Sequence, residues 1–221
     1  MRPYLYLLCS LLMVTGLLLL IDPEATASMT KETGIVEVGT AVLYVVLVVS
    51  LLFYARTGWL AGKFWYALMA GLLLCRELDL HKAFTTMGIF KSRFYESPDV
   101  PVVEKACGAV VVLAILVSVV FTFVKSRNFL FQGIRQRNPI HVGILVAFCL
   151  AVMSQLFDGL HGRLEKIGLS FNESTLMYSG IFEEVLEVGI PIALIIAVAY
   201  TRNKPLESEA ALESEAKLEV L

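Results

Sequence analysis

Long apolar runs separated by short polar breaks dominate this sequence. A hydrocarbon core about 30 Å thick requires roughly 20 apolar residues in a helix that rises about 1.5 Å per residue. Six runs have about this length, at residues 3–21, 34–55, 64–85, 106–124, 140–160 and 175–200. Because an open strand leaves backbone groups unpaired in lipid, these runs predict helices. The sequence therefore predicts an all-α, polytopic integral membrane protein with about six transmembrane helices.

The same pattern divides the chain into two parts. Residues 1–200 hold all six apolar runs and are expected to form a single transmembrane domain. Residues 201–221 contain two copies of Leu-Glu-Ser-Glu-Ala, which is typical of a solvated acidic tail. Within residues 1–27, the first run precedes Ala25-Thr26-Ala27, a pattern of small residues that also fits a signal-peptide cleavage site. A retained signal anchor is favoured, because the run is longer than the apolar region of most signal peptides.

Composition and charge agree with membrane insertion. Hydrophobic residues make up 57% of the chain and charged residues 17%, and the mean hydropathy is +0.76. These values exclude a soluble enzyme, and a net charge of −2 gives no support to nucleic-acid binding. Lys and Arg are more frequent in the loops on the side of the N-terminus. The positive-inside rule thus predicts that both termini are cytoplasmic. The expected location is the bacterial inner (plasma) membrane, with several spans.

Ionisable side chains inside the predicted spans gather toward the outer ends of four helices. A charge inside a span costs on the order of 2.5 to 3.5 kcal/mol, so each one suggests a functional site. The group consists of Glu37, Arg76, Glu77, Asp79, His81, Asp158, His161, Glu183, Glu184 and Glu187. Acids outnumber bases in this group, which predicts a bound cation, retained protons or a covering basic loop.

A divalent metal is the most specific of these options. Helical bundles hold metal ions with ligands three or four residues apart on facing helices. Such pairs are Glu77 with His81, Asp158 with His161, and Glu183 or Glu184 with Glu187. Mixed imidazole and carboxylate ligands suit zinc, iron or manganese and do not distinguish among them.

These residues receive separate predicted roles. The expected metal ligands are His81, Asp158, His161 and Glu187. The expected general base for a metal-bound water is Glu77, Glu183 or Glu184. Glu37, Arg76 and Asp79 complete the polar cluster, although Arg76, Asp79 and Lys82 also fit a salt-bridged helix end at the lipid interface.

The sixth run carries the strongest functional signal. Glu183, Glu184 and Glu187 share one arc of the helix, which contains no basic residue within the apolar stretch, so they require shared protons or a cation. Pro191 cannot donate a hydrogen bond to the carbonyl oxygen of Glu187, which leaves that acceptor free.

Two motifs resemble those of known membrane enzymes. Phe182-Glu183-Glu184 resembles the Glu-Glu motif of the CAAX-type intramembrane proteases. That motif continues to an arginine and precedes two histidine motifs, whereas here position 187 is Glu and no histidine follows. The predicted His and Asp ligands resemble in style the site of the alkaline ceramidase type of hydrolase, but its His-x-x-x-His pattern is missing. Neither resemblance establishes membership.

The loop at residues 87–104 has a composition typical of the membrane surface. Ile89, Phe90, Phe94 and Tyr95 lie among basic residues, so this loop is expected to cover the site or to act as a lipid anchor alone.

The sequence therefore predicts a metal-dependent hydrolase or related enzyme that acts on a lipid or lipid-linked substrate near the extracytoplasmic face. A proton- or divalent-cation-coupled transporter is an alternative, because carboxylates in a bundle also carry protons and ions. A second alternative is an accessory subunit of a membrane complex. The expected partners are membrane lipids and a small-molecule or lipid substrate. A membrane protein partner and a homo-oligomer are further alternatives.

Overall fold

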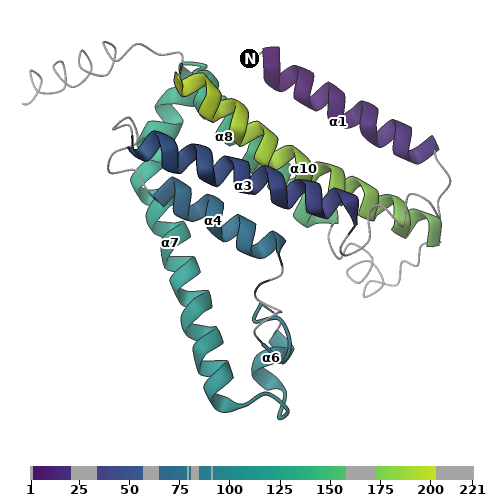
Figure 1. Cartoon of the computed structure of the whole chain (residues 1–221), viewed down its shortest axis with the longest axis vertical. Coiled ribbons are helices and arrows are strands. Elements are labelled where there is room, and N and C mark those ends of the chain that lie inside the picture. The colour runs from purple at the N-terminus through teal and green to yellow at the C-terminus, as the bar shows by residue number, and fades with distance from the viewer. Residues whose placement is uncertain are drawn as a thin grey trace, which may run out of the picture.

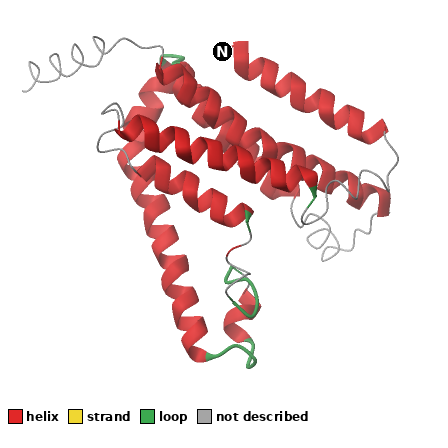
Figure 2. Ribbon diagram, viewed as in Figure 1, coloured by secondary structure: helices red, strands yellow, loops and turns green. Residues whose placement is uncertain are grey.

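The protein is all-helical in the computed structural model, which describes residues 2–20, 34–56, 65–78, 80, 85–90, 92–157 and 173–202 (Figures 1 and 2). No strand occurs among these residues, which confirms the all-α part of the predicted fold class. The helices are α1 (Arg2–Leu20), α3 (Ile35–Arg56), α4 (Trp65–Glu77), α6 (Ser92–Glu96), α7 (Val102–Arg135), α8 (Pro139–Phe157) and α10 (Glu173–Arg202).

Four helices in the described part of the chain are long and apolar enough to cross a membrane. They are α1, α3, α8 and residues Val102–Val124 of α7. This finding supports a membrane protein but not the predicted count of six spans. The described α4 has 13 residues, too few to cross a bilayer core alone. The 30-residue α10 carries three glutamates within its apolar stretch.

A packed bundle forms around α10, which contacts α8, α3 and α1 (Figure 1). Tyr44 and Leu47 of α3 and Ile181 and Ala193 of α10 are almost fully buried. Small residues let the helices approach closely, as is common where helices associate in lipid. At Gly189, for example, the helix surface accepts the side chain of Leu11 from α1.

The N-terminal helix docks on this bundle along one face. Tyr4, Leu7, Leu11 and Thr15 are buried, and their spacing places them on a single stripe. The Tyr4 hydroxyl donates a hydrogen bond to the Pro139 carbonyl oxygen at 2.8 Å, where α8 begins. Its ring lies against Gly143, so α1 contacts both α8 and α10.

The other side of the molecule is more open. The 34 residues of α7 correspond to a helix about 51 Å long. α7 contacts α8 and α4, and its first half diverges from the bundle (Figure 1). Only 6% of its candidate span is buried, against 28% of the α8 span. Exposed Val, Leu and Phe side chains on α7 are unfavourable in water and fit a lipid environment.

Candidate functional site

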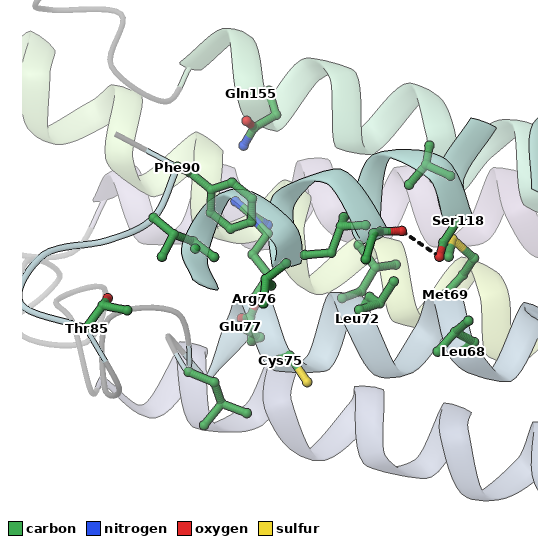
Figure 3. A pocket seen from close by; sticks show the side chains of 18 of the residues that line it. Leu68, Met69, Leu72, Cys75, Arg76, Glu77, Thr85, Phe90, Ser118 and Gln155 are labelled. Carbon is green, nitrogen blue, oxygen red and sulfur yellow. Dashed lines mark hydrogen bonds between the residues drawn. The ribbon is translucent and has the colours of Figure 1, made fainter. Parts of the chain in front are cut away.

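A cavity of about 1310 Å³ lies between α4 and α7 and reaches α10 (Figure 3). The two helices meet where Trp65 contacts Phe121, with ring centroids 6.3 Å apart. From there they separate toward the end of α4 (Figure 1). The apolar walls are formed by Leu68, Leu72 and Leu73 of α4 and by Val111, Ile115 and Val119 of α7. The cavity thus occupies the space between two diverging, largely apolar helices.

The lining becomes acidic toward the end of α4. Among the described residues, six glutamates and one arginine line the cavity. Five of these glutamates come from three helices and are Glu37, Glu77, Glu183, Glu184 and Glu187. Glu184 lies close enough to the other four to interact with them electrostatically. One end of the cavity therefore concentrates negative charge, and we refer to these five residues as the acidic cluster.

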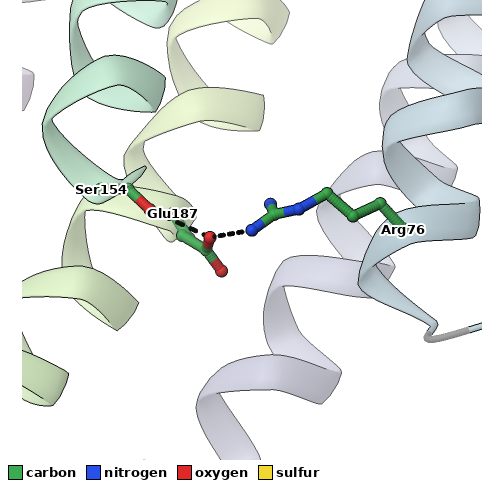
Figure 4. Close-up of polar contacts among 3 residues, drawn as sticks. All are labelled: Arg76, Ser154 and Glu187. Carbon is green, nitrogen blue, oxygen red and sulfur yellow. Dashed lines mark hydrogen bonds and ion pairs between the residues drawn. The ribbon is translucent and has the colours of Figure 1, made fainter. Parts of the chain in front are cut away.

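Arg76 connects α4 to α10 across this cluster (Figure 4). Its Nη2 atom donates a hydrogen bond to Oε1 of Glu187 at 2.7 Å and forms an ion pair with it. The Arg76 side chain is 41% exposed, whereas that of Glu187 is 12% exposed. Arg76 also interacts electrostatically with Glu77, so its charge offsets part of the repulsion among the acids.

Ser154 of α8 makes the third contact of this group. Its hydroxyl donates a hydrogen bond to the same Glu187 Oε1 atom at 3.0 Å (Figure 4). Ser154 is almost fully buried. Two donors from different helices therefore fix one carboxylate oxygen, which holds Glu187 in a defined position between α4 and α8.

The structure places the predicted residues in two groups. Glu77, Glu183 and Glu184, the predicted general bases, line the cavity together with Glu187, Glu37 and Arg76. Asp79, His81, Asp158 and His161 lie outside the described residues. The structure shows Arg76 paired with Glu187. The predicted salt-bridged helix end of Arg76, Asp79 and Lys82 stays a prediction, because Asp79 and Lys82 lie outside the described residues.

The predicted metal site rests largely on residues outside the described part of the chain. Within the described part, no group of three or more His, Cys, Asp and Glu side chains is arranged to hold a metal ion. Glu187, the one predicted ligand that is described, is bound to Arg76 and Ser154. The structure thus shows an acidic cavity, and its metal remains a prediction.

Sequence reasoning assigned no role to several residues that shape this site. Ser154 received no role, although a lone hydroxyl in an apolar run is itself a signal. Gln155 also lines the cavity, as do Phe90 and Glu104 of the loop that was expected to cover the site. Their contribution depends on how α6, α7 and α8 are arranged, which local spacing does not reveal.

Comparisons with protein-family models, with curated proteins and with solved structures gave no match for this chain.

Proposed function

We propose that this chain is a multi-pass membrane enzyme, a metal-dependent hydrolase or a related enzyme, that acts on a lipid or lipid-linked substrate. The observation that supports the proposal is the change in polarity along the cavity. Its walls between α4 and α7 are apolar, and its far end holds the acidic cluster with Arg76. An amphiphile matches this arrangement, with its hydrocarbon chain between the helices and its polar part at the cluster.

The size and surroundings of the cavity fit such a substrate. Sites for drug-sized ligands usually measure about 300 to 1,000 Å³, and this cavity of about 1310 Å³ is larger. Lipid chains are as apolar as Leu side chains, so entry of a chain from the bilayer gains little hydrophobic free energy. Recognition must then come mainly from polar contacts at the acidic end.

Charge balance supports a cation at this end. Arg76 is the one basic residue among the described residues that line the cavity, and it is already paired with Glu187. A divalent metal would offset the remaining acids and would polarise a substrate oxygen or activate a water molecule. In this proposal, Glu77, Glu183 or Glu184 would act as the general base, and His81, Asp158 and His161 would join Glu187 in holding the metal.

The proposal includes six membrane-crossing helices, in which the apolar run at 64–85, whose described helical part is α4, and α10 join the four helices that are long and apolar enough. α10 has 30 residues, which correspond to about 45 Å and exceed the thickness of a bilayer core. Its glutamates line the cavity, so α10 can cross the membrane without presenting them to lipid. The proposal also puts both termini in the cytoplasm of a bacterial cell.

Metal content tests the chemical part of the proposal. We would purify the native chain in mild detergent and measure metals by elemental mass spectrometry, beside the variants Glu187→Ala and His81→Ala, each of which removes one proposed ligand. We expect a stoichiometric metal in the native chain and its loss in both variants. Folded native protein without metal would contradict a metal-dependent enzyme and would direct attention to proton-coupled transport in liposomes.

A matched pair of tryptophan variants tests whether lipid occupies the cavity. Ile115 lines the cavity, whereas the neighbouring Leu116 is exposed on α7 and lies outside the lining. We expect Ile115→Trp to lower the amount of lipid that co-purifies with the chain severalfold, and Leu116→Trp to leave it unchanged. Equal lipid retention in both variants would contradict a lipid-binding cavity, whatever the metal content.

A further inference from the structure

The chain between α4 and α7 folds back onto the first turns of α7. We call residues 85–90 and 92–100, which include α6, the cover segment. Ile89, Phe94 and Val100 form a small buried core of their own, with Met87 and Val112 packed against it. Figure 1 shows α6 beside the first half of α7, away from the main bundle. The cover segment is thus attached to α7 by an apolar contact of its own.

A polar contact fixes the start of the same segment. The carboxylate of Glu104 accepts a hydrogen bond from the Thr86 backbone N–H at 2.6 Å and another from the Thr86 hydroxyl at 2.9 Å. Glu104 lies in the first turn of α7. Thr85, Ile89 and Phe90 line the cavity, so this attachment also holds one of its walls (Figure 3).

The level of the cover segment relative to the membrane follows from its contact with α7. The apolar span of α7 begins at Val102. Phe94 lies against Gly108, where an added Cβ atom would come within 2.8 Å of its ring. Gly108 is six positions after Val102, so the two residues lie about 9 Å apart along the helix axis. Phe94 therefore lies within the first two turns of the apolar span.

The exposed side chains of the cover segment fit a position at the edge of the hydrocarbon core. Tyr95 is 37% exposed, and Phe90, which also lines the open cavity, is 53% exposed. Arg93 and Glu96 are exposed beside them. Aromatic side chains among charged ones are enriched where the hydrocarbon core meets the headgroups. This face is also continuous in the chain with the exposed apolar residues at the start of α7.

We propose that the cover segment lies in the headgroup layer of the membrane, with Phe90 and Tyr95 in contact with lipid, and that it shields the acidic end of the cavity from bulk water. The partner of this surface is the lipid bilayer itself. The inference depends on membrane insertion of α7 and not on any particular reaction, so it stands or falls separately from the proposed enzyme.

Spin labels measure this depth directly. Single-cysteine variants Phe90→Cys and Tyr95→Cys would be prepared in a chain without the four native cysteines, matched to the native chain in melting temperature, and placed in nanodiscs. Labels at Val117, in the middle of the α7 span, and at Gln136, in the turn after α7, serve as lipid and water references. Accessibility to oxygen and to a water-soluble nickel chelate is recorded for each label.

We expect the labels at Phe90 and Tyr95 to be several times more accessible to oxygen, relative to nickel, than the label at Gln136. Accessibilities equal to those at Gln136 would overturn the proposal. Gly108→Leu should detach Phe94 and shift the Tyr95 label toward the water reference, whereas Gly39→Leu, with open space at its Cβ position, should not. An unchanged Tyr95 label in Gly108→Leu would overturn the role of α7 as the anchor.

Discussion

The two sides of this molecule use similar apolar helices in different ways. In the bundle of α1, α3, α8 and α10, small residues such as Gly143, Gly189 and Ala193 lie where helices meet. On the other side, α7 has a run of Val, Leu and Ile, and it separates from α4 to leave the cavity. Because lipid removes most of the hydrophobic drive for helix association, close packing depends on such small residues.

This difference assigns a separate task to each side. The bundle holds Ser154 and Glu187 in fixed positions, because both side chains project from tightly packed helices. The α4–α7 side provides space for a ligand, because α4 and α7 are in contact at Trp65 and Phe121 and diverge along their lengths (Figure 1). A rigid frame beside an open wall is a common arrangement for a binding site, since it fixes polar groups without filling the cavity.

The largest expected loss of stability comes from enlarging a glycine where helices of the bundle are in close contact. An added Cβ atom at Gly143 would lie 2.8 Å from the Cβ atom of Ala197 and would also clash with the Tyr4 side chain. We expect Gly143→Val to destabilise the chain by about 3 kcal/mol, because α1 and α10 must both shift. Thermal unfolding in detergent measures this loss.

A glycine with open space provides the control for that substitution. Gly39 has no atom within 4 Å of its Cβ position, so Gly39→Ala should not lower the melting temperature and gains helix propensity of about 1 kcal/mol. If Gly143→Val melts like the native chain, the contrast between a packed and an open side is wrong.

A smaller effect is expected at the contact that joins the two sides. Arg76→Leu leaves the Glu187 carboxylate among the other acids, which should cost about 1 to 3 kcal/mol. The double variant Arg76→Leu, Glu187→Leu removes both charges and should be less destabilised than Arg76→Leu alone. A double-mutant cycle of melting experiments gives the coupling.

The exposed Arg135 of α7 is a control for the loss of a positive charge. Arg135→Leu should change stability by less than about 0.5 kcal/mol. Additive effects of the Arg76 and Glu187 substitutions would show that this ion pair does not connect the two sides energetically.

The smallest expected effect distinguishes two serines. Ser154 donates its hydrogen bond to Glu187 on another helix, whereas Ser118 donates to the Ala114 carbonyl oxygen of its own helix. Ser154→Ala should cost about 1 kcal/mol, and Ser118→Ala should cost almost nothing. Equal melting temperatures for the two variants would indicate that Ser154 does not help to hold Glu187.

The sequence predicted the positions of the helices well. The run at 34–55 became α3, Ile35–Arg56, and the run at 140–160 became α8, Pro139–Phe157. Apolar length decides these boundaries because lipid tolerates few polar residues. The run at 106–124 lies within the longer helix α7, which begins at Val102 and ends at Arg135. Hydropathy detects only the part of a helix inside lipid, whereas Lys, Arg and Gln favour helix beyond it.

The candidate site was less predictable than the helices. The expectation that charged residues gather at one end of the spans led to Glu77, Glu183 and Glu184, which line one cavity. The pairing of Arg76 with Glu187 joins positions 111 residues apart and depends on how α4 and α10 are arranged. Local helix spacing contains no information about such a contact, so it emerged only from the fold.

The opening between α4 and α7 also determines how a ligand would compete for the site. In a bilayer, lipid chains would fill this apolar space in the absence of a ligand, because an empty cavity would lose dispersion contacts. A substrate of the proposed kind would therefore have to displace an abundant neighbour. Saturation of the site would then follow the mole fraction of substrate in the membrane, and dilution with inert lipid would lower occupancy even when the total substrate concentration stays constant.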